Sequence, residues 1–233
     1  MDIVYLVKNC YTNEELTYSL RSLVNLPHDR VIIVGGCPAN INKHTLVHFP
    51  IFQGGNKYSN TTANLKTICQ NKELSEDFIL MNDDFFILKP VTVEDLKVCR
   101  GPIDKVLESY VYRYGTDANP YISGMRKTKI FLQDLGIREP LSYELHIPMV
   151  INKKKFLDMF SLPHIEGVKP LHKRTLYGNL YCKGFKEIND VKVLNEYYYP
   201  FGSDKFLSTE DNSWPRVKPF MQNLFPNKSE FEI

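Results

Sequence analysis

One eleven-residue run constrains the fold of this 233-residue chain more than any other segment. From Phe78 to Leu88 it reads four apolar residues, then Asn82, Asp83 and Asp84, then four more apolar residues. A short apolar run that stops at polar residues is typical of a strand buried on both faces. Two neighbouring carboxylates at the end of such a strand are costly to ionise, because burial and mutual repulsion both favour their protonated forms.

A divalent cation bound at this strand end would remove that cost. Oxygen ligands suit Mg²⁺ or Mn²⁺, and these ions usually also hold substrate phosphates. Open α/β sheets place their ligands at the carboxyl ends of the strands. The run therefore predicts a metal–diphosphate site with Asp83 and Asp84 as metal ligands and a nucleotide-sugar as substrate. The alternative is an acidic hairpin turn, because Asn-Asp-Asp is also good turn chemistry, but the absence of glycine favours the metal site.

Composition predicts one α/β domain over residues 1–233. The chain is 43% hydrophobic, and no linker, repeat or low-complexity segment divides it. Its five cysteines are widely spaced and form no C-x-x-C pair, which argues against a zinc site or a disulfide framework and favours a reducing compartment. No signal peptide and no apolar stretch long enough to span a bilayer is visible, so we expect a soluble, cytoplasmic protein.

Charge is unevenly distributed along the chain. The net charge is only +2, but residues 126–186 hold 12 basic and 5 acidic residues, a net charge of +7. The simplest interpretation of any single lysine is a solvated face. A whole segment this basic modestly favours an anionic partner such as phosphates or nucleic acid.

Hydrophobic periodicity predicts a β-α-β unit at the start of the chain. Ile3–Val7 and Val31–Val34 are expected as parallel strands, joined by a helix that Thr12 or Asn13 caps. The further elements expected are a strand over Thr45–Phe49, a helix through Ala63–Cys69, a turn over Pro120–Gly124, helices over Met125–Leu135 and Lys154–Phe160, a loop or strand over Ser142–Pro148, and a last helix near Arg216–Leu224. Val106–Tyr112 fits either a strand or a helix, and the tail from Asn195 on is expected to cap the sheet.

Two further segments could carry chemistry, each with a simpler alternative. Tyr58–Asn64 would place backbone N–H groups and hydroxyls at a helix start, which suits a phosphate, although an ordinary capping segment looks the same. Glu144 and His146 are two residues apart, so in a strand they share a face, and either could act as a general base. His146 could also be a third metal ligand, or simply a structural histidine beside a surface glutamate.

The late part of the chain holds two weaker candidates. Asp211, within Ser208–Ser213, could place a further carboxylate near the metal. The alternative is that this segment is a surface turn. The aromatic and basic residues over Tyr177–Lys186 could stack on bases or sugars, but a core role is favoured.

Five ordered blocks resemble those of a group of small bacteriophage glycosyltransferases. The blocks are Glu15–Leu23, Lys57–Thr62, Met81–Phe86, Leu141–Pro148 and Phe206–Asp211. The chain is more distantly similar to the Stealth family of capsular-polysaccharide phosphotransferases, through the Leu-x-Tyr-Ser-Leu-Arg-Ser helix and the Asn-Asp-Asp-x-Phe segment. The resemblance implies a GT-A-like fold with a mostly parallel central sheet flanked by helices. Residues 1–100 would form the nucleotide-sugar-binding half, and residues 101–233 the acceptor-binding half and cap.

The resemblance also implies roles for individual residues. The Asn-Asp-Asp segment stands where such enzymes carry a D-x-D motif, with Asn82 in place of the first Asp, Asp84 as the final metal ligand and Asp83 as the second. The implied donor-site residues are Arg21, Lys57, Tyr58, Asn60, Thr61, Thr62, Asn82 and Asp83. The implied residues of the reacting centre are Glu144, His146 and Asp211.

These observations predict a Mn²⁺- or Mg²⁺-dependent glycosyltransferase that moves a sugar from a nucleotide-sugar to an acceptor hydroxyl. A hydroxymethylated base in phage DNA, modified in the host cytoplasm, is the acceptor favoured by the basic segment. One alternative is a Stealth-like transfer of hexose 1-phosphate. The other is a non-catalytic module that binds nucleic acid or sugar without metal.

Overall fold

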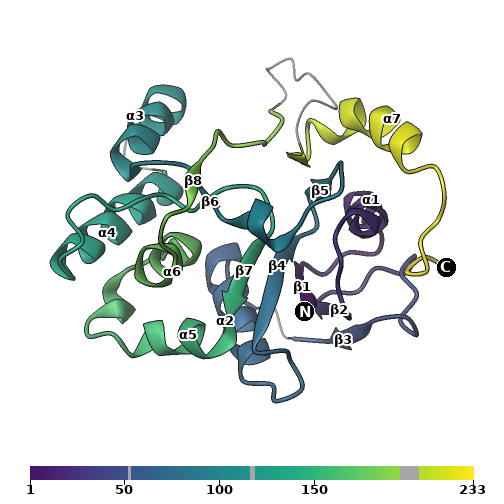
Figure 1. The fold of residues 1–233 in the computed structure, drawn as a ribbon, viewed down its shortest axis with the longest axis horizontal. Helices are drawn as coiled ribbons and strands as arrows, with labels where there is room; N and C mark the ends of the chain where they lie inside the picture. The colour runs from purple at the N-terminus through teal and green to yellow at the C-terminus, as the bar shows by residue number, and fades with distance from the viewer. Residues whose placement is uncertain (52–53, 116–118, 195–204) are drawn as a thin grey trace.

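The computed structural model describes residues 1–51, 54–115, 119–194 and 205–233. In these residues five strands form one sheet in the order β3-β2-β1-β4-β7 (Figure 1). Its strands are β1 (Asp2–Val7), β2 (Val31–Gly35), β3 (Val47–Phe49), β4 (Asp77–Asn82) and β7 (Met149–Asn152). The first four run parallel and β7 pairs antiparallel with β4, which confirms the predicted α/β class and its mostly parallel sheet.

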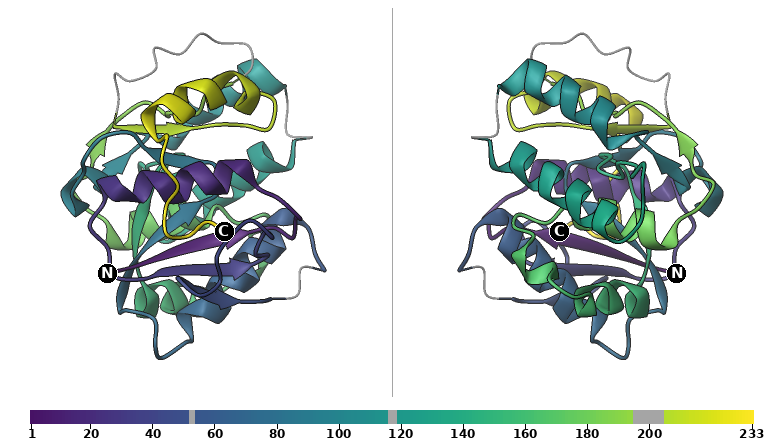
Figure 2. Two further views of the ribbon diagram at one scale, coloured as in Figure 1. Left: turned by 90° about the vertical axis from the view of Figure 1, so that its right-hand side faces the viewer. Right: turned by 90° about the vertical axis from the view of Figure 1, so that its left-hand side faces the viewer.

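Helices cover both faces of this sheet. They are α1 (Glu14–Ser22), α2 (Lys57–Cys69), α3 (Ile103–Tyr114), α4 (Pro120–Asp134), α5 (Lys153–Asp158) and α6 (Lys173–Tyr181). A further helix, α7 (Trp214–Leu224), packs away from this sheet in a separate cluster with Phe86 and Leu207. The face with α1 packs Ile3 and Tyr5 against its leucines, and the opposite face packs Val4 and Phe78 with residues of α2 to α6. Figure 2 shows α1 and α7 from one side of the molecule and α3, α4 and α5 from the other.

Helix α1 forms where the sequence predicts it. The Asn13 side chain accepts a hydrogen bond from the backbone N–H of Leu16 at 2.9 Å, so Asn13 is the N-cap. Leu16 and Leu20 are buried, as their helical spacing predicts. Two acidic residues in the first turn and Arg21 in the last turn complement the helix dipole.

The second apolar half of the 78–88 run leaves the central sheet. Strand β5 (Phe85–Ile87) pairs antiparallel with β9 (Phe206–Ser208). A further small sheet joins β6 (Val98–Cys99) to β8 (Lys186–Glu187). The acidic residues therefore lie between two different sheets, and the hairpin-turn alternative is wrong.

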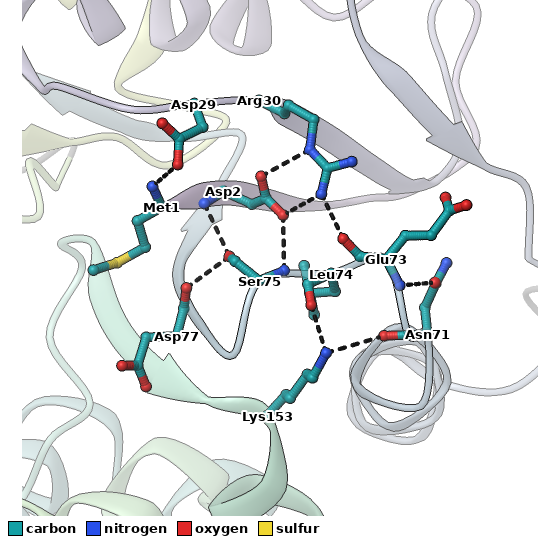
Figure 3. A network of polar contacts seen from close by, with 10 residues as sticks. All are labelled: Met1, Asp2, Asp29, Arg30, Asn71, Glu73, Leu74, Ser75, Asp77 and Lys153. Atoms are coloured by element: carbon teal, nitrogen blue, oxygen red, sulfur yellow. Dashed lines mark hydrogen bonds and ion pairs between the residues drawn. The ribbon is translucent and has the colours of Figure 1, made fainter.

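A polar network stabilises the opposite, N-terminal edge of the sheet (Figure 3). The Asp2 carboxylate, only 2% exposed, accepts hydrogen bonds from Arg30 at 2.7 and 3.0 Å and from the backbone N–H of Ser75 at 2.9 Å. Burial raises the pKa of Asp2, but the hydrogen bonds and charge of Arg30 and the bonds from Ser75 outweigh it, so the pKa lies below its usual value. This network links β1, β2 and the loop before β4, and leaves the carboxyl edge open.

Several predicted boundaries differ from the structure. Pro120–Gly124 is not a turn but the start of α4, because Asn119 caps the helix and proline suits its first turn. Val106–Tyr112 is helical within α3, and Ser142–Pro148 contains no strand. The helix predicted near Arg216–Leu224 begins earlier, at Trp214. The predicted cap from Asn195 on lies outside the described residues as far as residue 204.

No helix in the described ranges is long and apolar enough to cross a membrane. The predicted division into a donor-binding half, 1–100, and an acceptor-binding half, 101–233, stays a prediction.

Candidate active site

Strands β1 and β4 end side by side at the carboxyl edge of the sheet, because Leu6 pairs with Asn82 in their parallel register. The loops that follow two such strands meet where open α/β sheets place ligands. A cavity of about 860 Å³ opens at this edge. Its wall comes from the segment after β1, the first turns of α1 and α2, the end of β4, Lys192, and the residues that follow β9.

Seven of the twelve predicted site residues line this cavity. They are Lys57, Asn60, Thr61, Asn82, Asp83, Asp84 and Asp211. Segments far apart in the sequence thus converge on the Asn-Asp-Asp strand end. Asp211 lies in an exposed turn, as the alternative interpretation predicted, and this turn also forms part of the cavity wall.

Glu15 joins the aspartates as a further carboxylate of this wall. Burial raises its pKa to about 7, and the negative charges of Asp84, Asp83 and Asp211 add to this rise, against a hydrogen bond from Thr209. From the sequence, Glu15 is only the first residue of the block Glu15–Leu23, with no predicted role of its own. Its position after the first strand of a β-α-β unit was a signal that it could face the carboxyl edge.

Asp83 shows the same crowding of negative charge. Burial raises its pKa to about 6, and the neighbouring Asp84 contributes to the rise. The Asn13 amide donates a hydrogen bond to the Asp83 carboxylate at 2.7 Å, while the Asn13 carbonyl oxygen caps α1. One residue therefore couples the start of α1 to the acidic strand end.

The donor set suits a hard divalent cation. Asp83, Asp84, Glu15 and Asp211 offer carboxylate oxygens. Burial and the crowding of these carboxylates raise the pKa of Glu15 and Asp83, and a bound cation would favour their ionised forms. Within the described residues, no group of three or more His, Cys, Asp or Glu side chains is close enough to hold a metal by itself. A cation here would therefore complete its ligands with phosphate or water oxygens, as Mg²⁺ commonly does.

Asp84 has positive and polar partners from the late part of the chain. The Lys192 ammonium lies 3.3 Å from the Oδ2 atom of Asp84, and the Ser208 hydroxyl donates to the same oxygen at 3.2 Å. Neither partner was predicted, because Lys192 belongs to no motif and Ser208 was named only within the segments Ser208–Ser213 and Phe206–Asp211, with no role of its own.

One face of α2 forms another wall of the cavity. Lys57, Asn60, Thr61 and Asn64 recur at helical spacing and all line it. The Lys173 ammonium of α6 donates to the Thr61 hydroxyl at 2.9 Å and so ties the two halves of the chain together. Tyr58 and Thr62, two predicted donor-site residues, do not line the cavity.

Arg21 is not brought to this cavity, contrary to its predicted place in the donor site. Its guanidinium donates to both carboxylate oxygens of Glu232 at 2.7 and 2.6 Å and to the backbone carbonyl of Phe225 at 2.9 Å. The side chains of Arg21 and Glu232 are 12% and 6% exposed. Arg21 therefore fastens the C-terminal segment over α1.

Glu144 and His146 also lie outside the cavity wall. Glu144 accepts the backbone N–H of Thr175 at 3.1 Å in the first turn of α6. His146 is held by Asp190, whose carboxylate accepts its backbone N–H at 3.0 Å and contacts its Nδ1 at 2.8 Å. His146 lies three residues before β7, whose first residue pairs with Leu80 near the end of β4, and the centroid of its ring is 6.1 Å from that of Phe85. It therefore lies near the acidic edge without lining the cavity.

No protein-family model matches the chain. No curated protein matches its sequence either. Solved structures do match its fold. A crystal structure of the galactosyltransferase LgtC with donor and acceptor sugar analogues aligns with a TM-score of 0.51 at 12% identity, covering 98% of this chain and 96% of that one. An active-site mutant of LgtC aligns with a TM-score of 0.51 at 13% identity, covering 99% and 98%.

These similarities define the fold class. The chain has the fold of GT-A-type glycosyltransferases, as the resemblance in its sequence implied. At such low identity the likeness concerns the fold alone, and function must be argued from the site.

Proposed function

We propose that this protein is a metal-dependent glycosyltransferase that uses a nucleotide-sugar donor. The observation that carries the proposal is the position of Asp83 and Asp84, in a cavity of about 860 Å³ at the carboxyl edge of a GT-A-type sheet. This volume is in the range of small-molecule sites. The wall combines carboxylates with Lys8, Lys57 and Lys192, the mixture that a cation and a diphosphate together require.

The proposed roles of individual residues are as follows. Asp83 and Asp84 hold the cation, with Glu15 and Asp211 near enough to add charge. A bound Mn²⁺ or Mg²⁺ would neutralise the negative charge that develops on the departing nucleoside diphosphate. The polar face of α2 faces the ligand with amides and hydroxyls that suit sugar or ribose hydroxyl groups. His146, beside the acidic edge, is the proposed acceptor-side base.

The contacts of the basic segment argue against a surface dedicated to DNA. A DNA acceptor was favoured by the net charge of residues 126–186, but several of these basic groups are engaged within the protein. Lys129 pairs with Asp104 at 2.5 Å, and Lys153 and Arg174 donate to backbone carbonyls. The proposal therefore names an acceptor hydroxyl and leaves modified DNA as one acceptor to be assayed.

Calorimetric binding of UDP and GDP, with and without Mn²⁺, tests the donor site. We expect Mn²⁺-dependent binding of one of them that Asp84→Ala weakens at least about tenfold, because a cation ligand is lost. Asp95→Ala is the matched control, since Asp95 pairs with Lys205 at 2.6 Å and does not line the cavity. No nucleotide binding under either condition would refute the donor site and favour the non-catalytic module.

A further inference from the structure

Lys192 forms an ion pair inside the cavity with the residue proposed as the final metal ligand. Its ammonium lies 3.3 Å from the Oδ2 atom of Asp84, and the two side chains are 23% and 19% exposed. Ser208 donates to that same oxygen at 3.2 Å. One oxygen of Asp84 therefore has a positive partner within the protein itself.

The backbone on both sides of Lys192 is anchored, so the lysine is held at this place. Val193 donates its N–H to the Ser208 carbonyl at 2.7 Å, and Ser208 donates back to the Val191 carbonyl at 3.3 Å. Two residues before the lysine, Asp190 contacts the His146 ring at 2.8 Å. Only the flexible side chain of Lys192 can move without disturbing these contacts.

A cation at Asp84 and the ammonium of Lys192 compete for the same carboxylate. Two positive charges a few ångströms apart repel strongly in a partly buried cavity. A lysine side chain is a compact charge on a long flexible stem, so it can turn to a new partner. An entering diphosphate brings at least two negative charges into the same cavity, and it is the partner that the displaced ammonium would find there.

We propose that Lys192 is an exchangeable counter-ion. It neutralises Asp84 while the site is empty, and it moves to the phosphates of the donor when a divalent cation takes Asp84. This inference rests on the proposed function, since it assumes a cation and a diphosphate in one cavity. It adds that Lys192 weakens cation binding when no nucleotide is present. When the cation is bound, Lys192 strengthens nucleotide binding, so that cation and donor bind cooperatively.

The first arm of the test measures Mn²⁺ binding to the nucleotide-free protein, by calorimetry and by the loss of the free-ion electron paramagnetic resonance signal. Lys192→Met should bind Mn²⁺ about tenfold more tightly than wild type, because the competing charge is gone. Lys192→Arg, which keeps the charge, should not. The matched control is Lys205→Met, which breaks the Lys205–Asp95 pair outside the cavity and should leave Mn²⁺ affinity unchanged.

The second arm measures UDP and GDP binding at saturating Mn²⁺. Lys192→Met should weaken binding of the preferred nucleotide about tenfold, through loss of a phosphate contact. Equal Mn²⁺ affinity in wild type and Lys192→Met, or no Mn²⁺ binding in either, would overturn the exchange. If Lys192→Met bound Mn²⁺ more tightly but bound nucleotide as well as wild type does, the proposed move of the Lys192 ammonium to the phosphates would be wrong. Release of a nucleoside diphosphate from a nucleotide-sugar by wild type tests the proposed function separately, whatever the lysine does.

Discussion

Asp190 is expected to stabilise the segment that borders the acidic edge, and Asp190→Asn tests this. Its carboxylate accepts the backbone N–H groups of His146 and Val191, both at 3.0 Å, contacts the His146 ring at 2.8 Å and lies 3.5 Å from Arg100. Burial raises the pKa of Asp190, but the charge and hydrogen bonds of His146 and the charge of Arg100 outweigh this and hold the pKa well below its usual range. The folded state therefore strongly favours the ionised form.

The expected loss of stability depends on which buried groups each substitution leaves without a partner. The Asp190 side chain is only 12% exposed, and removing one partner of a buried ion pair typically costs about 3–5 kcal/mol. We expect that loss for Asp190→Ala. Asp190→Asn keeps one acceptor oxygen and the shape, so we expect about 2–3 kcal/mol, or a decrease in melting temperature of about 4–12 °C.

Urea and thermal denaturation at several pH values measure this effect. Because the folded pKa of Asp190 is depressed, its contribution is fully present above the unfolded value near 3.8 and is lost as pH falls from there toward the folded value. The difference in free energy of unfolding between wild type and Asp190→Asn should be constant near neutral pH and should decrease below about pH 4. Asp104→Asn, which breaks an exposed pair with Lys129, should change stability by less than about 1 kcal/mol. Equal stability of Asp190→Asn and wild type at pH 7, or a gap that widens in acid, would refute the reasoning.

Three other substitutions test further parts of the structure. Asn13→Ala removes the cap of α1 and the partner of Asp83, so it should cost about 1 kcal/mol in urea denaturation and weaken Mn²⁺–nucleotide binding in calorimetry. Gly178→Ala would place a Cβ 2.3 Å from the Tyr143 ring, so it should lower the free energy of unfolding by about 1–3 kcal/mol. Asp2→Asn should lower the melting temperature at pH 7, and the deficit should shrink below pH 3.8, because the folded pKa of Asp2 is depressed.

Controls for the first two substitutions are available in the chain. Thr12→Ala changes a cavity-lining neighbour that does not cap α1, so it should leave stability unchanged. Gly167→Ala adds a Cβ with nothing within 4 Å, so it should be tolerated. An effect of these controls as large as that of Asn13→Ala or Gly178→Ala would contradict the assigned causes.

Local sequence patterns predicted the central part of the fold. The apolar run that ends at Asn82 predicted a strand buried on both faces, and β4 is the fourth strand of the central sheet's order. The helix cap at Asn13 and the buried leucine stripe of α1 follow from residue type and spacing. These features depend on neighbours a few residues apart, which is the range over which such patterns carry information.

Long-range pairing accounts for most of what the sequence did not predict. Strand β5 has three residues, and its partner β9 is fixed by packing rather than by any pattern in either segment. Arg21 was expected at the donor site, yet its carboxylate partner, Glu232, lies 211 residues further along. Lys192 and Asp190 belong to no motif, and only the folded backbone brings them to Asp84 and His146.

The proposed function assigns to Asp83 and Asp84 a site for transfer of a sugar from a nucleotide-sugar. Its most direct test is to incubate the protein with a panel of UDP- and GDP-sugars and Mn²⁺, and to identify the nucleotide released by chromatography. We expect release of a nucleoside diphosphate from one class of donor, dependent on Mn²⁺ and lost in Asp84→Ala. Release of a nucleoside monophosphate would instead indicate sugar-phosphate transfer, and release of neither nucleotide from any donor would contradict glycosyl transfer at this site.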